Sequence, residues 1–311
     1  MRVGGCLVSF CLLALLTAGL ARAEAVPEER ARAVEDCRYG RASEGGHSGA
    51  FPADDVFRPL LADPKQPQFF ASWQAARVRT DHTSANVGSV GFGENFGFYT
   101  NREGCNGWQV GLLAGVFSQF NLDAPSSDLV NTDFVVGVPV SWRSGLVSGR
   151  VRLYHQSSHL GDEFLLGRPG FNRVNLSFEE IEAIFSLDAP EGWGRVYAGG
   201  GYLIHREPAG LDRHRVQWGL ELRGPVWHWP AVETAMKDAL GVRPVFGVDC
   251  KSVEELRWIV NTNVVGGIEL VRPGATRQFR ILFNYYRGFN PYGQFFAQKI
   301  ESIGLGLYLA F

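Results

Sequence analysis

The chain has 311 residues, with 30 Lys and Arg against 32 Asp and Glu, and a mean hydropathy of −0.06. This balance lacks the basic surface that nucleic acid requires, so we expect no nucleic-acid partner. It also excludes a helical membrane protein, because beyond the N-terminus no stretch approaches the ~20 apolar residues of a spanning helix. Gly (38), Phe (22) and Trp (8) are nevertheless frequent, which is typical of a transmembrane β-barrel, where only alternate residues face lipid.

The N-terminus has the pattern of an export signal. Arg2 supplies a positive charge, an apolar run extends from Cys6 to Leu20, and Ala21-Arg22-Ala23 forms a small-x-small cleavage pattern. We therefore predict a cleaved signal peptide over residues 1–23. Residues 24–67, first charged and Gly-rich and then rich in proline, are predicted to form a periplasmic segment.

Three cysteines would remain after cleavage of the signal. Cys37 and Cys105 both fall on the periplasmic side of the predicted topology, so these two could pair in an oxidising compartment. The alternative is that Cys37, Cys105 and Cys250 are free, buried thiols.

Residues 68–311 are predicted to form one all-β domain, an antiparallel up-and-down barrel of the outer-membrane type with about 12 strands. Apolar and polar residues alternate in segments of roughly 10–14 residues, which turn residues separate. In the third segment, for example, Trp108 and Val110 share one face and Gln109 points to the other. The predicted strands are 69–79, 87–100, 107–120, 130–142, 146–158, 172–187, 193–206, 214–224, 243–250, 257–271, 276–287 and 299–311.

The connections between these segments predict which end of the barrel faces outward. An even number of strands leaves both termini in the periplasm, where turns are short, while the extracellular loops are longer. The short set is 143–145, 188–192 and 272–276; the long set is 121–129, 159–171 and 288–298. Residues 225–242 are an exception on the periplasmic side, and a short helix is predicted there over 231–240.

The C-terminal segment predicts how the barrel is assembled. Ile303, Leu305 and Leu307 alternate with glycines, and the chain ends at Phe311. A last strand of this period with a terminal aromatic resembles the signal that the barrel-assembly machinery reads. We expect that machinery to be a partner, and the outer membrane of a Gram-negative bacterium to be the location.

The fifth segment carries the candidate chemistry. Arg150 and Arg152 must face a wet lumen, because a charge on the lipid side near the midplane costs ~2–4 kcal/mol. A salt-bridge network is the favoured role for these two arginines, and a substrate channel is the alternative. Strand parity then places His155 and Ser157 on the lipid-facing side, near the extracellular end.

Three residues of this region form a candidate triad. Two residues along a strand are separated by ~6.6 Å, so His155 could take the proton of the Ser157 hydroxyl. The following segment, if it begins at Asn172, brings the amide of this residue across from the histidine, where it could fix the tautomer. A pair formed by Ser158 and His159 is a rival, but its members face opposite sides of a strand. His205, His214 and His228 have no ligand spacing and are predicted to be incidental.

Two motifs carry a resemblance to a known family. Tyr154-His155-Gln156-Ser157, followed by Phe171-Asn172-Arg173-Val174, resembles the active-site hairpin of the outer membrane phospholipase A family, and residues 286–289 and 303–307 resemble its last hairpin. The resemblance implies a twelve-stranded barrel with a Ser-His-Asn triad on its outer surface that works with calcium as a dimer. The runs 157–164 and 59–64 are more similar to a family of uncharacterised bacterial barrel proteins.

The resemblance also implies a metal and an oxyanion site. The nearest candidate oxygen ligands for calcium are Asp162, Glu163 and Ser158, with an exposed acidic loop as the alternative for the two carboxylates. Backbone N–H groups near Ser158 are the candidate oxyanion donors. The turn 290–293 is predicted to help cover the site.

The sequence thus predicts a lipid-directed acyl ester hydrolase of the phospholipase A type. Its partners would be membrane lipids, either phospholipid or lipid A, and a second copy of the chain in a homodimer. The alternatives are a barrel that binds or transports small anions, and a structural envelope protein with a degenerate site.

Overall fold

The computed structural model describes residues 48–310, except 53–54, 104–105, 229–240 and 272–277. Several predictions therefore fall outside the described residues: the signal peptide, the pairing of Cys37 with Cys105, the helix at 231–240, and Phe311. Cys250 is a free cysteine of intermediate exposure.

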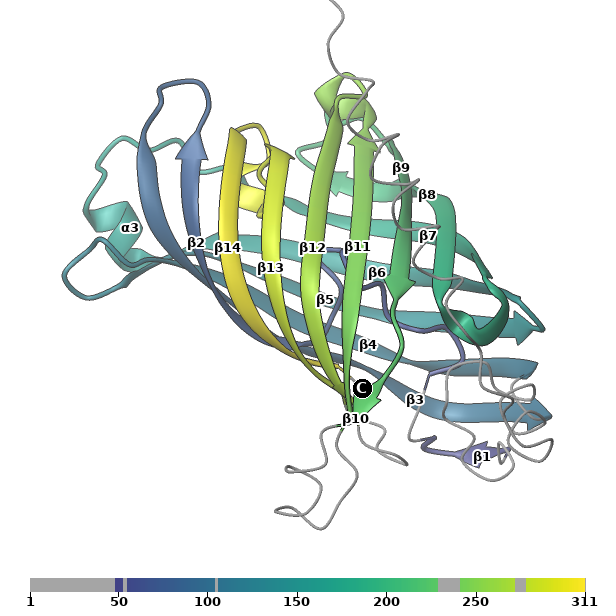
Figure 1. Cartoon of the computed structure of the whole chain (residues 1–311). Coiled ribbons are helices and arrows are strands. Elements are labelled where there is room, and N and C mark those ends of the chain that lie inside the picture. Colours follow the sequence, from purple (N-terminus) through teal and green to yellow (C-terminus); the bar gives the residue numbers. More distant parts are fainter. Residues whose placement is uncertain (1–47, 53–54, 104–105, 229–240, 272–277, 311) are drawn as a thin grey trace, which may run out of the picture.

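One antiparallel sheet of 14 strands forms the molecule, and its long strands close into a barrel because β14 pairs with β2 (Figure 1). Two strands of the sheet, β1 (Gly49–Ala50) and β10 (Trp227–His228), are only two residues long. The long strands are β2 (Phe69–Val78), β3 (Ser84–Glu103), β4 (Asn106–Asn121), β5 (Asp128–Ser144), β6 (Val147–Leu160), β7 (Ser177–Asp188), β8 (Gly194–Glu207), β9 (His214–Arg223), β11 (Gly241–Val253), β12 (Val260–Val271), β13 (Gln278–Phe289) and β14 (Lys299–Ala310). The predicted twelve-stranded antiparallel barrel is confirmed.

The connections have the predicted asymmetry. At one end, β5 and β6 are joined by a two-residue turn with Gly145 at a φ of 59°, and β7 and β8 by the short helix η1 (Pro190–Gly192). At the other end the loops are long and carry α3 (Asp162–Leu166), η2 (Glu254–Leu256) and η3 (Gly293–Phe295). The C-terminus lies at the end of the short turns (Figure 1). We refer to the end with the long loops as the outer end.

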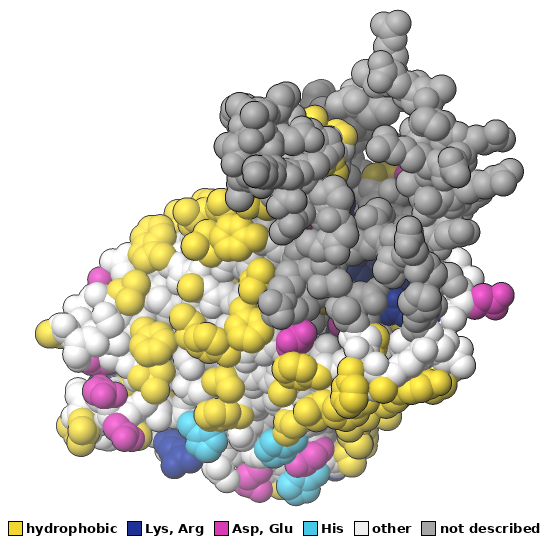
Figure 2. Space-filling model, turned by 90° about the horizontal axis from the view of Figure 1, so that it is seen from below, with side chains coloured by type: hydrophobic (Ala, Val, Ile, Leu, Met, Phe, Trp, Pro, Cys, Tyr) yellow, Lys and Arg dark blue, Asp and Glu magenta, His cyan; other side chains and the backbone are white. Residues whose placement is uncertain are grey.

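The outside of the barrel is apolar. On β5, four alternate side chains are between 45% and 51% exposed, namely Phe134, Val136, Val138 and Val140. Figure 2 shows such side chains spread over one face of the barrel, with histidines and acidic groups close together along one margin of the apolar area. Contiguous exposed apolar surface of this kind needs a non-aqueous environment. Within the described ranges, no helix is long and apolar enough to cross a membrane.

The lumen is charged and internally paired. Arg150 and Arg152 are both buried and both contact the carboxylate of Glu182 on β7, at 3.1 Å and 2.7 Å. On the opposite wall, Nε of Arg280 lies 2.6 Å from Oε2 of Glu269. The predicted luminal salt-bridge network is therefore confirmed, and desolvated charges of this kind are tolerable only because each has a partner.

The segment before β2 enters the lumen. Residues 55–68, here called the plug, bury Phe57, Leu60 and Leu61 against the inner wall. The backbone N–H of Leu61 donates to Glu221 at 2.8 Å, and Asn263 donates to the carbonyl of Ala62 at 2.7 Å. The prediction that residues up to 67 belong to a periplasmic segment is wrong for this part. Its apolar side chains are spaced to fill the interior, which a composition-based reading could not recognise.

Two ion pairs fix the plug to opposite walls. Lys251 of β11 lies 2.6 Å from Asp63, and Lys65 lies 2.6 Å from Asp133 of β5. Burial alone would raise the pKa of Asp63, but the charge and hydrogen bond of Lys251, the charge of Arg152 and the backbone N–H of Lys65 together outweigh it and lower the pKa to about 2. The carboxylate of Asp63 is therefore ionised at neutral pH and holds the plug to β11.

Candidate active site

Three side chains on the outer face form a hydrogen-bonded row across neighbouring strands. The strand register pairs His155 of β6 with Glu179 of β7, and Glu179 with His205 of β8. Their neighbours along the strands, Tyr154 and Glu180, are buried in the lumen. The row therefore lies outside the barrel, at the outer-end margin of the apolar belt, as predicted for His155.

The carboxylate of Glu179 holds both imidazoles. Its Oε1 lies 2.8 Å from Nδ1 of His155, and its Oε2 lies 2.8 Å from Nδ1 of His205. An ionised carboxylate only accepts, so each histidine must donate its Nδ1–H. This fixes the tautomer of His155 and leaves its Nε2 free to accept a proton, which is the arrangement of a general base oriented by an acid.

A β-bulge positions the second histidine. The pairing of β7 with β8 shifts register between Glu179 and Glu180, because Glu180 pairs with Leu203 and Glu179 pairs with His205. The extra residue, Ile204, is exposed, and so is His205 beside it. Bulges re-aim side chains next to functional sites, and without this one His205 would point into the lumen.

Ser157 lies two residues from His155 on the same face, as predicted. Its direct cross-strand partner is Ser177, the first residue of β7, and the other neighbour is Phe134 of β5. Side chains of directly paired residues have Cβ atoms ~5 Å apart, so the two serine hydroxyls lie next to each other. Among the described residues, the hydroxyl of Ser157 makes no hydrogen bond to His155.

The predicted position of Asn172 is wrong. The ladder between β6 and β7 ends at Ser157 and Ser177, so Asn172 lies in the loop, exposed and away from any pairing with His155. The parity assumed for the following strand is wrong as well, because Leu176 and Phe178 are buried inside. The alternate apolar side chains of residues 174–178 have the pattern of a lipid-facing strand, but Leu176 and Phe178 pack inward at the outer end of the lumen.

The predicted calcium ligands are not brought together. Asp162 and Glu163 lie exposed in the first turn of α3, whereas Ser158 is buried inside and donates to Asp133 at 2.5 Å. The backbone N–H of Ser158 donates to the carbonyl of Leu176 at 3.0 Å and is not available to an oxyanion. Across the described part of the chain, no three His, Cys, Asp or Glu side chains form a metal-binding group.

The turn 290–293 and the following Gln294 cover the outer end of the lumen beside Ser158. The amide of Gln294 donates to the carbonyls of Ser158 at 2.8 Å and Val174 at 2.7 Å. The backbone N–H of Gly293 donates to Asp133 at 3.1 Å. These bonds tie the loop before β14 to β6, so the backbone that carries Ser157 is held rigidly from the inside.

Glu179, His205 and Ser177 were not predicted as site residues from the sequence. Glu179 stands at an outward position that continues with Ile181 and Phe185, so an unpaired charge there would be costly. The cost that places Arg150 and Arg152 in the lumen applies equally to Glu179. Glu179 can be recognised as the partner of His155 only when the register between β6 and β7 is known. The 16 residues between these strands leave that register undetermined in the sequence.

The closed sheet, the apolar outside and the charged lumen define a β-barrel of the outer-membrane type. Within that class, the chain belongs to the family described as "Protein of unknown function (DUF1207)", whose model matches residues 20–311. A search of curated proteins finds no significant match.

Solved structures of outer membrane phospholipase A have a similar fold. The enzyme from Escherichia coli is 11% identical, with a TM-score of 0.53 over 83% of this chain and 95% of the enzyme. The calcium-bound dimer from Salmonella typhi is also 11% identical, with a TM-score of 0.52 over 78% and 90% of the two chains. At this identity the likeness is one of fold.

Proposed function

We propose that the protein is a lipid-directed acyl ester hydrolase, with Ser157 as nucleophile, His155 as base and Glu179 as the group that orients the base. The observation that carries the proposal is the 2.8 Å contact between Nδ1 of His155 and Glu179 on the lipid-facing side, with Ser157 two residues along the same face. The phospholipase fold of the neighbouring structures supports lipid as the substrate class.

The chemistry would proceed in two steps. Ser157 Oγ attacks the acyl carbonyl while its proton moves to Nε2 of His155, and Glu179 stabilises the imidazolium that forms. When the tetrahedral intermediate collapses, the ester C–O bond breaks and the imidazolium returns the proton to the leaving alcohol. Water then attacks the acyl-serine by the same route and releases a fatty acid. For the first transfer, Ser157 must rotate toward His155.

The hydroxyl of Ser177 is the proposed oxyanion donor. It lies directly across from Ser157 on the same face, and the N–H of Ser158 is already bonded within the barrel. A single positioned donor is worth ~10²–10³ in rate in other hydrolases. The predicted set of Asp162, Glu163 and Ser158 does not fit calcium, so no step is routed through a metal.

The height of the site favours a substrate of the outer leaflet. His155 and Ser157 lie near the outer end of β6, just beyond the apolar side chains of Val151 and Leu153. An ester bond at the boundary between head group and acyl chain would reach the site without leaving the membrane. Phospholipid and lipid A both carry such esters.

The test is acyl release by the refolded protein from mixed micelles, run separately with phospholipid and lipid A, and with calcium or a chelator. We expect release by the natural protein, loss of release in Ser157→Ala, and no change in Ser84→Ala, an exposed serine at the outer end of β3. Equal release from Ser157→Ala, or none from a folded barrel with calcium, would contradict the proposal. The row of Glu179 and its two histidines would then be a structural pairing of polar groups at the membrane border.

A further inference from the structure

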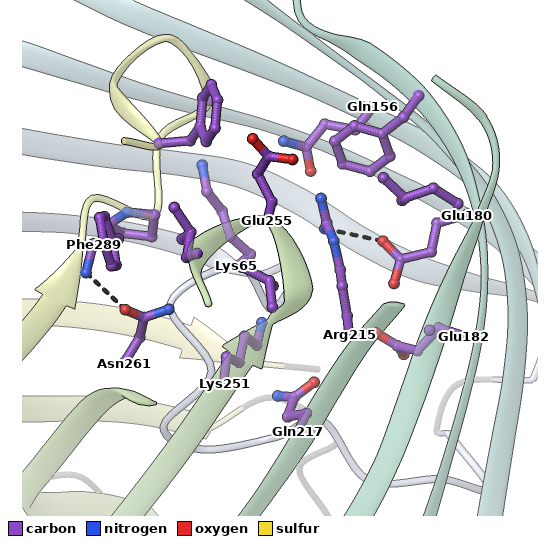
Figure 3. A pocket seen from close by; sticks show the side chains of 18 of the residues that line it. Lys65, Gln156, Glu180, Glu182, Arg215, Gln217, Lys251, Glu255, Asn261 and Phe289 are labelled. Carbon is purple, nitrogen blue, oxygen red and sulfur yellow. Dashed lines mark hydrogen bonds and ion pairs between the residues drawn. The ribbon is translucent and has the colours of Figure 1, made fainter. Parts of the chain in front are cut away.

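A separate cavity of about 180 Å³ lies inside the outer half of the barrel (Figure 3). Its floor includes Lys65 of the plug, and its walls come from β6, β7, β9, β11 and the loop before β14. Exposed residues at its rim, Asp212, His214 and Glu255, place its mouth at the outer end. The cavity faces the lumen and shares no residue with the row on the outer face.

Around the cavity, the carboxylates lie deeper in the wall than the cations. Glu180 and Glu182 are buried in the wall, with side chains 3% and 8% exposed. The cations that pair with buried carboxylates reach further into the space: the side chain of Arg215 is 33% exposed and that of Lys251 is 29% exposed. Figure 3 shows Arg215 reaching back to Glu180, with Lys65 and Lys251 on the other side of the space.

Deeper in the wall, one donor has no partner. Nε of Arg152 is buried and forms no hydrogen bond with any described residue, although its NH2 group contacts Glu182 at 2.7 Å. A buried, unpaired donor is costly, and this one lies behind the surface of the cavity. The inner part of the cavity therefore presents two accessible cations, and the carboxylates behind them are already bonded.

The remaining lining residues include apolar and aromatic side chains beside the amides of Gln156, Gln217, Asn261 and Asn263 and the carboxylate of Asp249. Phe178, Leu203 and Leu211 lie on one part of the wall, and Phe289 and Phe296 on the loop side. Apolar walls with a few convergent polar groups are the usual composition of a ligand site. The volume is below the ~300–1,000 Å³ of sites for drug-sized molecules, so the ligand must be small.

We propose that this cavity binds a small organic carboxylate with an apolar, ring-sized body. Its carboxylate lies between Arg215 and Lys251, and its body packs on Phe289 and Phe296, whose side chains are partly exposed. Two carboxylates, those of Asp212 and Glu255, stand at the rim, and the backbone N–H of Asp212 donates to the carboxylate of Glu255 at 2.8 Å. The negative charges of these rim carboxylates repel a dianion more strongly than a monoanion, so they favour a ligand with a single charge.

The test is calorimetric titration of the refolded, full-length protein with benzoate, with benzyl alcohol as the uncharged match and inorganic phosphate as the anion without a ring. We expect benzoate to bind and the other two to bind at least ~10-fold more weakly, since a hydrogen bond to a charged group is lost with the alcohol and apolar contact is lost with phosphate. Equal binding of benzyl alcohol, or stronger binding of phosphate, would overturn the assigned class.

Two variants locate the site. Arg215→Gln should weaken the binding of benzoate at least ~10-fold. Glu180 still accepts from the hydroxyl of Tyr154 at 2.6 Å, so this buried carboxylate keeps a hydrogen-bond partner in the variant. Arg77→Gln, which removes the same charge from an exposed position on β2, should leave binding unchanged. Ser157→Ala should also leave benzoate binding intact, which separates this site from the proposed hydrolase. Unchanged affinity in a folded Arg215→Gln barrel would refute the inference.

Discussion

Replacing Glu179 by Gln is the most informative single change at the outer-face site. The natural carboxylate accepts from both imidazoles at 2.8 Å. A glutamine amide has one oxygen and one NH2 group, so it can accept from only one Nδ1–H and presents a donor to the other. The base then loses either its fixed tautomer or the negative charge that stabilises the imidazolium, or both.

The size of the effect follows from the contact and its exposure. A hydrogen bond to a charged group is worth ~1.5–3 kcal/mol, which corresponds to a ~10–150-fold change in rate. The side chains of His155 and Glu179 are 39% and 38% exposed, so solvent screening moves the expectation to the lower end, about 10-fold. The loss should appear in kcat and leave KM nearly unchanged, since Glu179 orients the base and does not bind the acyl chain.

The assay is initial-rate acyl release from mixed micelles across substrate concentration, with folding checked by heat-modified gel mobility. His205→Gln is the matched control, because it removes the second contact of the same carboxylate and leaves the pair of His155 and Glu179 in place. We expect this control to lose less activity than Glu179→Gln. If Glu179→Gln retains the natural kcat, the row does not orient a base and the reasoning is wrong.

Three further predictions concern the barrel. Val138→Arg puts a charge on the lipid side and should lower the free energy of unfolding by ~2–4 kcal/mol in urea titrations, with Val138→Leu near neutral; an equal effect of both would contradict the lipid-facing assignment. Arg280→Met removes the contact at 2.6 Å to Glu269 but leaves the pair of Glu269 with Arg243 in place, so it should cost ~1.5–3 kcal/mol in the same assay; a neutral result would mean that the luminal pair is dispensable. The pKa of Asp63 is lowered to about 2, so its contribution should be full above the unfolded pKa of ~3.9 and should be lost as the pH falls toward 2. Unfolding midpoints measured against pH should show this loss, and a Lys251→Gln barrel with the same acid dependence would refute it.

The strands and their faces could be predicted from the sequence because each spanning segment repeats a two-residue period. On β6, the alternation of Arg150 and Arg152 with Val151 and Leu153 fixed the parity, and the structure places these side chains as expected. The asymmetry of loop lengths follows from the even number of strands, since β2 begins and β14 ends at the end with the short turns.

The partners of His155 could not be predicted from the sequence, because they depend on where the next strand begins. The loop after β6 holds α3 and an inward-packing apolar run, and no local pattern separates that run from a strand. A five-residue error in the start of β7 replaced Glu179 with Asn172. The bulge that exposes His205 depends in turn on the pairing of β7 with β8, which no single segment encodes.

The position of the plug inside the lumen also could not be predicted from local sequence patterns. Residues 55–68 have no strand period, and their buried positions are determined by luminal partners far along the chain, such as Glu221 and Asn263. Such long-range complementarity appears only when the barrel is closed. The same holds for the cavity above the plug, whose cations Lys65, Arg152, Arg215 and Lys251 come from four separate segments.

Covalent labelling of the nucleophile tests the central claim most directly. A long-chain alkyl sulfonyl fluoride presented in micelles should sulfonylate an activated serine with loss of fluoride, and peptide mass spectrometry then identifies the residue. We predict one adduct, on Ser157, formed at least ~10-fold more slowly in Glu179→Gln. No adduct on a folded barrel, or an adduct on another serine at the same rate, would contradict an active site built from Ser157, His155 and Glu179.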